Sequence, residues 1–244
     1  MTGESSGRKS TVEEIRQYFD ADVETYSNLE SGQSATVDSP LAMSLIAEVA
    51  AATTPKATRV LDVGCGAGNH TLKLLERLPN LDVTLIDLSK PMLDRAVARI
   101  QAITKASIKA VQGDIRAIDI GLQRYDIVLA SMVLHHLREE SQWRAVFEKF
   151  YTGLRPGGSI WIFDLVDSPI PDVQSTMRRR YGEYLTQLGG EAYRDQAFAH
   201  MDKEDTPRSL VFQLDLLREV GFSQVEVLHK NTCFAAFGAV KTGT

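Results

Sequence analysis

The stretch VLDVGCGAGNHTLKL (60–74) decides the fold of this 244-residue chain. Apolar residues run up to three alternate glycines, and an amphipathic run at 71–78 follows at once. The pattern predicts a strand, a glycine-rich turn and a helix, which is the opening unit of a doubly wound α/β sheet. Glycines lack the Cβ that would obstruct a sharp turn or a close ligand, and the helix N-terminus directs its N–H groups into the same crevice.

The glycine spacing indicates which nucleoside this crevice binds. A dinucleotide-binding turn has the pattern G-x-G-x-x-G, whereas residues 64–68 have G-x-G-x-G and Asn69 takes the place of the third glycine. Asp87 ends the next predicted strand, where a carboxylate can accept hydrogen bonds from both ribose hydroxyls of NAD or of S-adenosylmethionine (SAM). The spacing favours SAM.

The composition is that of one folded domain in a reducing compartment. Hydrophobic residues make up 43% of the chain, which is ordinary for a globular protein, and the net charge of −5 argues against a broad nucleic-acid surface. The only cysteines are Cys65 and Cys233, so a disulfide framework is not expected. The N-terminus lacks the apolar core of a secretion signal, and no run reaches membrane-spanning length. We therefore expect a cytoplasmic protein of enzyme size.

Strands and helices alternate through most of the chain, which predicts a parallel sheet with helices on both faces. The expected parallel strands are 59–63, 82–87, 107–112, 125–130 and 159–164. The expected helices of this region are 39–52, 71–78, 89–104, 138–154 and, after a turn at 155–158 and the fifth strand, 206–221. The last two strands, 224–229 and 232–240, have only Lys230-Asn231 between them, so they form an antiparallel hairpin.

The predicted fold class is therefore α/β: a doubly wound, mostly parallel seven-stranded sheet with an antiparallel C-terminal hairpin and a helical lid. A NAD-binding domain would continue with parallel strands, so the hairpin is a second argument for SAM. Residues 11–244 are expected to form one domain after a disordered tail at 1–10.

Two segments outside the alternation are expected to cover the crevice. Residues 11–38 form an N-terminal cap that begins with a capping box at Thr11–Glu14. Its aromatic residues, at 18, 19 and 26, form either a hydrophobic staple or a flap over the cofactor. Residues 165–205 are inserted at the carboxyl end of a strand, which predicts a substrate lid. The lid residues expected to meet the substrate are Arg180, Tyr181 and Tyr184.

Five motifs resemble, in order, those of the class I SAM-dependent methyltransferases: LDVGCGAG, IDLSKPML, GDI, YDIVLASMVLHHL and LRPGGSIWI. The resemblance covers roughly residues 18–241. It implies a Rossmann-like fold, SAM as cofactor and Asp87 as the ribose-binding acid. It also implies that Asp114 meets the exocyclic amine of adenine and that Ile115 offers its backbone N–H.

The cofactor-binding residues that we expect come from the N-terminal cap and from the carboxyl ends of four strands. They are Tyr26, Asp62, Gly64, Cys65, Gly66, Gly68, Asp87, Leu88, Asp114, Ile115 and Ala130. Asp62 has a second interpretation, a structural role in the glycine turn.

Two segments, GDIRAIDI and the tail LLREVGFSQVEVLHKNTCFAAFGAVK, resemble a closer branch, the carboxy-SAM synthases and related methyltransferases. That group, which serves tRNA wobble-uridine modification, uses a lid arginine to hold the carboxylate of its cofactor. Counted back from Gly221, the arginine position falls at Gly182-Glu183, just after Arg178, Arg179 and Arg180. We therefore expect plain SAM.

The predicted function is methyl transfer from SAM to a small-molecule acceptor. The alternatives are a carboxy-SAM synthase-like enzyme and a non-catalytic SAM-binding protein. The acidic balance and the lack of an added RNA-binding module disfavour a nucleic-acid substrate. A homodimer is compatible with the sequence.

His135, His136 and Asp164 are the expected catalytic residues, because they follow or end strands where side chains face the reacting methyl group. One imidazole would act as a general base, since it titrates near neutral pH. Alternatively, His135 packs against the adenosine and His136 caps the next helix. Asp164 would orient a substrate amine or hydroxyl. No metal site is expected, because the histidines with Glu139 and Glu140 match no standard ligand spacing.

Overall fold

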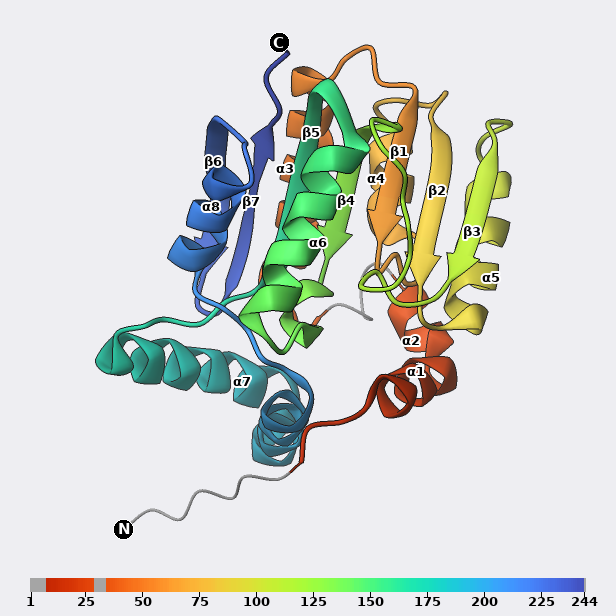
Figure 1. Ribbon diagram of the computed structural model, residues 1–244. Helices are drawn as coiled ribbons and strands as arrows, with labels where there is room; N and C mark the ends of the chain where they lie inside the picture. The colour runs from red at the N-terminus through yellow and green to blue at the C-terminus, as the bar shows by residue number, and fades with distance from the viewer. Residues whose placement is uncertain (1–7, 29–33, 244) are drawn as a thin grey trace.

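The computed structural model describes residues 8–28 and 34–243, which form one seven-stranded sheet in the order β3-β2-β1-β4-β5-β7-β6 (Figure 1). β7 is antiparallel to both of its neighbours, and the other pairs are parallel. The strands are β1 (Arg59–Val63), β2 (Asp82–Asp87), β3 (Ile108–Gln112), β4 (Tyr125–Ser131), β5 (Leu154–Leu165), β6 (Gln224–Asn231) and β7 (Phe234–Val240). The predicted fold class, with its parallel sheet and antiparallel hairpin, is confirmed.

Helices cover both faces of the sheet, α6 and α8 on one side and α3, α4 and α5 on the other (Figure 1). The helical elements are α1 (Val12–Ala21), α2 (Val23–Ser27), α3 (Ser39–Thr53), α4 (Asn69–Leu75), α5 (Lys90–Gln101), a short 3₁₀ turn η1 (Leu134–His136), α6 (Glu140–Gly153), α7 (Pro171–Glu204) and α8 (Leu210–Glu219). Among the described residues, no helix combines the length and apolar character that crossing a membrane requires.

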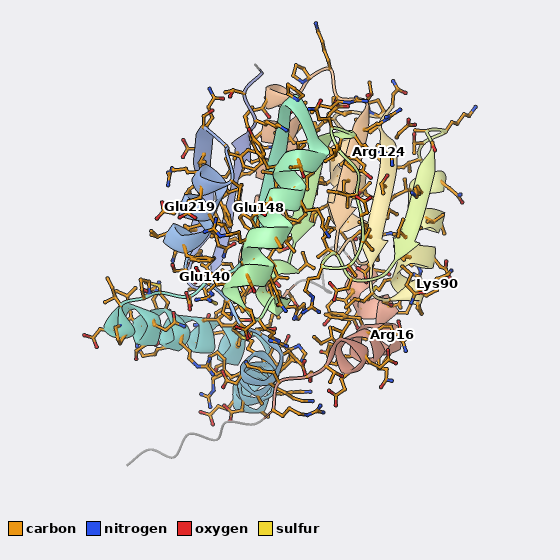
Figure 2. All side chains as sticks on the ribbon, viewed as in Figure 1. Arg16, Lys90, Arg124, Glu140, Glu148 and Glu219 are labelled. Carbon is orange, nitrogen blue, oxygen red and sulfur yellow. The ribbon has the colours of Figure 1, made fainter. Side chains whose placement is uncertain are left out.

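The amphipathic sequence of α6 shows how a helix joins the sheet. Trp143, Phe147 and Phe150 recur at helical spacing and are completely buried against the strands. Burying each such side chain stabilises the fold by roughly 1.5–3 kcal/mol. Glu140 and Glu148 project from the same helix into solvent (Figure 2). The helix is thus fixed in position, and so is the η1 turn that precedes it.

The carboxyl ends of the parallel strands point toward α1, α2 and α7 (Figure 1). α7 changes direction at Gly190, whose φ of 83° interrupts the helical backbone. Tyr181 and Tyr184 of α7 donate hydrogen bonds from their hydroxyls to the carbonyl oxygens of Ala35 (2.9 Å) and Ser34 (2.6 Å). These bonds hold α7 against the segment that leads into α3.

The two ends of the α7 segment lie side by side. Asp167, just after β5, forms an isolated parallel bridge with Ser209, just before α8. At the other end of the chain, the Lys9 ammonium donates to the backbone carbonyl of Asp205, and the Ser10 hydroxyl donates to Glu204 at 2.6 Å. Residues 1–7 of the predicted disordered tail, and residues 29–33 of the predicted N-terminal cap, lie outside the described residues.

Some boundaries differ from the prediction. The predicted turn at 155–158 belongs to β5, because Gly157 and Gly158 exchange backbone hydrogen bonds with Lys241. The hairpin turn falls after Asn231 rather than at Lys230-Asn231. Ser209, not Thr206, caps α8, since its hydroxyl accepts from the Phe212 N–H at 3.2 Å.

Candidate active site

The glycine turn between β1 and α4 has a left-handed backbone, which favours glycine, at two positions that bear on the site. Gly64 has φ of 64°, and a Cβ there would lie 2.5 Å from the side chain of Val133. Gly66 has φ of 49°, and a Cβ there would meet nothing within 4 Å. Gly66 lines the main cavity of the molecule, so its missing side chain leaves room for a ligand.

Asp87, at the end of β2, holds this turn in place. Its carboxylate accepts the backbone N–H of Gly66 at 2.8 Å and that of Ser89 at 2.9 Å. Burial raises the pKa of Asp87, and these N–H groups oppose the rise. A carboxylate has about four lone-pair sites, so sites are left for a ligand in the cavity that Asp87 lines.

Asp62 lies at the same end of β1 and is almost wholly buried. One carboxylate oxygen accepts the hydroxyl of Thr71, from the first turns of α4, at 2.6 Å. Burial raises the pKa of Asp62 to about 7, although the Thr71 hydrogen bond works in the opposite direction. Asp62 therefore braces the glycine turn through Thr71 and also lines the cavity.

Asp114 and Ile115 follow β3 and line the same cavity, as does Leu88 after β2. The guanidinium of Arg116 binds both carboxylate oxygens of Asp114, with Nε at 3.0 and 2.9 Å. Burial alone would raise the pKa of Asp114, but the Arg116 contacts outweigh it and lower that pKa. Asp114 is thus kept ionised as a hydrogen-bond acceptor.

The cavity has a volume of about 760 Å³ and continues from the glycine turn to the helices that cover it. α1 and α2 contribute Tyr18, Phe19 and Tyr26, and the rings of Phe19 and Tyr26 meet edge to face with centroids 5.3 Å apart. α7 contributes Tyr181 and Tyr193. The cap aromatics therefore pack on one another and also line the cavity, so the staple and flap interpretations are compatible.

At the far end of the cavity, η1 presents His135 above a buried carboxylate. Asp164 has no exposed surface and accepts the backbone N–H groups of Leu134 and Leu165, both at 2.7 Å, and the Nδ1 of His135. An ionised carboxylate only accepts, so Nδ1 holds the proton and Nε2 is directed away from Asp164. Although burial alone would lower the pKa of His135, the charges of Asp164 and Asp205 raise it to about 9.

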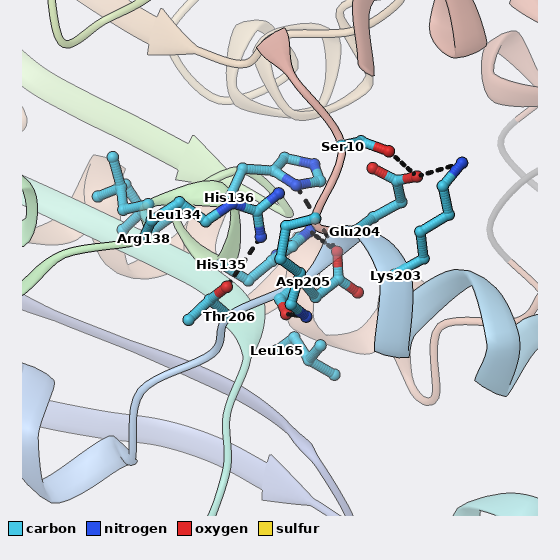
Figure 3. Close-up of polar contacts among 12 residues, drawn as sticks. Ser10, Leu134, His135, His136, Arg138, Leu165, Lys203, Glu204, Asp205 and Thr206 are labelled. Carbon is cyan, nitrogen blue, oxygen red and sulfur yellow. Dashed lines mark hydrogen bonds and ion pairs between the residues drawn. The ribbon is translucent and has the colours of Figure 1, made fainter. Parts of the chain in front are cut away.

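His136 and Asp205 complete this cluster, which Figure 3 shows together. The Thr206 N–H donates to the carbonyl of His135 at 2.7 Å, which brings Asp205 beside the two rings. Oδ1 of Asp205 lies 3.6 Å from His135 Nε2 and 3.6 Å from His136 Nδ1. Burial, with the neighbouring charges of His135 and Arg138, holds the pKa of His136 well below its usual value.

Comparisons with known proteins indicate the kind of enzyme to which such a site belongs. A family described as a methyltransferase domain matches residues 60–158, from β1 through the glycine turn into β5. The carboxy-S-adenosyl-L-methionine synthase of Shewanella piezotolerans is 25% identical over 194 residues, which cover 75% of this chain and 76% of that relative. Together these matches support a class I SAM-dependent methyltransferase.

Other similar proteins are methyltransferases too. Phosphoethanolamine N-methyltransferase 3 of Arabidopsis thaliana is 30% identical over 166 residues, 66% of this chain and 32% of its own. Human N-acetylserotonin methyltransferase in complex with SAM aligns with a TM-score of 0.56 at 20% identity, over 96% of this chain and 57% of its own.

An O-methyltransferase family protein of Burkholderia thailandensis aligns with a TM-score of 0.66 at 15% identity, over 93% of this chain and 62% of its own. These two structures show the fold, and this chain spans less than two thirds of either.

SAM is therefore the cofactor of this methyltransferase, and the residues fit it. The open space at Gly66 admits a ligand to the backbone, and Asp87 faces that space with lone pairs to spare. The buried Asp62 carboxylate lies where a ligand cation would stabilise its charge.

The methyltransferase brings most of the sequence-predicted site residues to one cavity, but not all. Within the described part of the chain, five of them do not line it: Gly68, Ala130, Asp164, Arg180 and Tyr184. Gly68 packs against α5, where a Cβ would lie 3.2 Å from Ala96. His136 does not cap the next helix, because Glu139 does so.

Among the cavity-wall residues that sequence reasoning missed, Asn69, His70 and Asp205 make polar contacts that shape the site. Asn69 donates from its side chain to the carbonyl of Tyr26 at 3.1 Å, which fastens the cap to α4. His70 shares a 2.7 Å hydrogen bond with the Ser131 hydroxyl, and burial lowers its pKa to about 4. Asn69 and His70 directly follow the glycine turn, so their position could have marked them as candidate site residues. Nothing in the sequence around Asp205 indicates a role in the site.

Proposed function

We propose that this methyltransferase transfers the methyl group of SAM to a small-molecule acceptor that binds between the glycine turn and His135, beneath α1 and α7. The observation that supports this most is the single cavity that joins both ends. Ligand sites for small molecules usually measure about 300–1,000 Å³. A cavity of about 760 Å³ that must hold SAM as well leaves room for an acceptor of modest size.

In this proposal, the residues at the carboxyl ends of β1, β2 and β3 hold the cofactor. Asp87 accepts from the ribose hydroxyls, Asp62 faces the methionyl ammonium, and Asp114 with Ile115 faces the adenine. Backbone carbonyls of the glycine turn are further acceptors, whereas Ala130, which does not line the cavity, has no role in this proposal. When bound, SAM supplies an activated methyl group, so the protein contributes mainly orientation and exclusion of water.

The acceptor end is formed by η1, the end of α7 and the cap. His135 presents Nε2 to the cavity, and Asp164 is a positioning residue for that ring rather than a group that meets the acceptor. α7 acts as the substrate lid, with Tyr181 on the cavity wall. Tyr184 secures the lid through Ser34, and Arg180 is exposed.

The arginine and lysine side chains near the cavity favour plain SAM over carboxy-SAM, because they are paired or exposed and do not offer a buried partner to an extra carboxylate. Among the described lining residues, the arginine and lysine side chains are Arg116, which is paired with Asp114, and the largely exposed Lys203. Arg178 pairs with Asp202, and Arg179 pairs with Glu183. An additional buried carboxylate without a partner costs several kcal/mol, so the proposed cofactor is SAM itself.

The test is transfer of isotope-labelled methyl from SAM into a metabolite extract, followed by mass spectrometry of the products. A labelled product below the size of a nucleic acid or protein supports the proposal. Labelled tRNA or protein would overturn it, and so would tight SAM binding with no transfer to any fraction. An Asp87→Asn variant is the control for SAM-dependent labelling.

A further inference from the structure

The His135–His136–Asp205 cluster has unpaired polar atoms that the proposed function does not explain. Among the described residues, neither ring nitrogen of His136 nor the Oδ1 of Asp205 makes a hydrogen bond of good geometry, although all three atoms are buried; the Glu204 backbone acts on the pKa of His136 as a hydrogen-bond partner would. Leaving a buried polar atom unpaired is unfavourable, so such atoms usually face a bound ion, water or ligand.

The separations between the atoms match those between ligands of one metal ion. Nitrogen and oxygen ligands lie about 2.0–2.2 Å from Zn²⁺, so two tetrahedral ligands are roughly 3.4 Å apart. Asp205 Oδ1 is 3.6 Å from a nitrogen of each histidine, and one ligand atom of each residue lies within 4.8 Å of the others. A hydrogen bond would need these pairs to approach to about 2.9 Å.

The surroundings of His135 also suit a metal ligand. Metal-binding histidines usually donate their other ring N–H to a carboxylate, which fixes the ring and its tautomer. Asp164 accepts from Nδ1 of His135 in this way, and it is fully buried. The nearby Arg138 guanidinium is turned toward the Thr206 hydroxyl, to which it donates at 2.8 Å, rather than toward Asp205 (Figure 3).

We propose that His135, His136 and Asp205 bind one divalent transition-metal ion at the acceptor end of the cavity. Two imidazoles and one carboxylate suit Zn²⁺, Fe²⁺ or Mn²⁺ better than Mg²⁺ or Ca²⁺, which prefer oxygen ligands. Three protein ligands leave a coordination position for an acceptor that offers an oxygen or nitrogen atom. This use in methyl transfer rests on the proposed function, whereas metal binding itself does not. The inference reverses the expectation that the chain has no metal site.

A protonated His135 is the competing explanation, because an imidazolium would compensate Asp164 and Asp205 without a metal. That explanation leaves both nitrogens of His136 without a hydrogen bond of good geometry. The two explanations assign different roles to His136. It is a metal ligand if a metal binds, and it binds nothing if a protonated His135 compensates the two carboxylates. Replacing His136 therefore separates them.

The experiment is a titration of chelator-treated protein with Co²⁺ and, separately, Zn²⁺. Co²⁺ is followed by its visible absorption, which intensifies when the ion leaves six-coordinate water for a protein site of lower coordination number. We expect one ion per chain and a higher melting temperature. His136→Ala and Asp205→Asn should each weaken affinity at least about tenfold, and Asp164→Asn by about 10–100-fold. His229→Ala, which removes an imidazole that pairs with Asp38 instead, should leave affinity unchanged.

The inference is overturned if no ion binds, or if both His136→Ala and Asp205→Asn bind it as the parent does. Either variant alone suffices if the other does not fold. The methyl-transfer assay, run on the chelator-treated protein and on the metal-loaded protein, keeps the two proposals apart. SAM-dependent methyl transfer without metal binding would overturn the metal site alone, and metal binding without transfer would overturn the proposed function alone.

Discussion

Replacing Asp62 with asparagine is expected to stabilise the ligand-free protein at neutral pH. The buried carboxylate has a pKa of about 7 in the folded chain, against 3.8 as its ordinary value. The folded state therefore binds more protons than the unfolded state between about pH 4 and pH 7. Stability falls as pH rises through that window, and the loss is complete above it.

The size of the effect follows from that difference in pKa. At 1.36 kcal/mol per pKa unit, a rise from 3.8 to about 7 makes the full loss roughly 4 kcal/mol. The asparagine side chain does not ionise, and its oxygen can still accept the Thr71 hydroxyl that Asp62 now accepts at 2.6 Å. The variant should thus be close to the parent in stability near pH 4 and more stable by that amount at pH 8.

Urea denaturation of both proteins at several pH values between 4 and 8 measures the difference directly. Titration of groups that do not interact with Asp62 cancels when the variant is compared with the parent at the same pH; Asp87 and Cys65, whose charges act on Asp62 or are acted on by it, are the exceptions. Asp172→Asn, an exposed carboxylate in the first turn of α7, controls for the loss of one surface charge. A stability difference that stays flat across this range would refute the reasoning, and SAM affinity should fall in the variant if Asp62 faces the ammonium.

Three further outcomes are expected. Asp87→Asn should weaken SAM binding by about 1.5–3 kcal/mol, the scale of a charge-assisted hydrogen bond, and calorimetry that instead detects NAD and no SAM would contradict the cofactor assignment. Arg180→Ala should leave SAM affinity and the preference for SAM over carboxy-SAM unchanged in a competition assay, because Arg180 is exposed; recovery of carboxy-SAM from the parent but not the variant would show otherwise. Tyr181→Phe should lower the free energy of unfolding by about 0.5–1.5 kcal/mol through loss of the hydrogen bond to Ala35, and an unchanged urea midpoint would show that this bond does not secure α7.

The sequence was sufficient for features that depend on local spacing. The glycines and Asp87 could be predicted because strand, turn and helix follow one another within a short stretch. His135 and His136 could be singled out because they come directly after β4. Their surroundings could not be predicted, since Asp205 reaches them from the far end of α7 and through a backbone bond between Thr206 and His135.

Long-range pairing also explains the boundary that was wrong at 155–158. The local sequence Arg-Pro-Gly-Gly favours a turn, but the hydrogen bonds of Gly157 and Gly158 to Lys241 override that signal and make it part of β5. Asp164 is the clearest case in the site. A carboxylate at the end of a strand was expected to meet the substrate, but the N–H of Leu134 and the ring of His135 surround it and bury it.

The bridge between Asp167 and Ser209 gives the molecule an evolutionary freedom. Because the chain leaves the sheet and returns to it at nearly the same point, the intervening segment can be lengthened, shortened or exchanged at little cost in loop-closure entropy. The strands that carry the glycine turn need not shift when it changes. Descendants of such a chain can acquire new acceptors by rebuilding α7 while their cofactor chemistry is inherited intact.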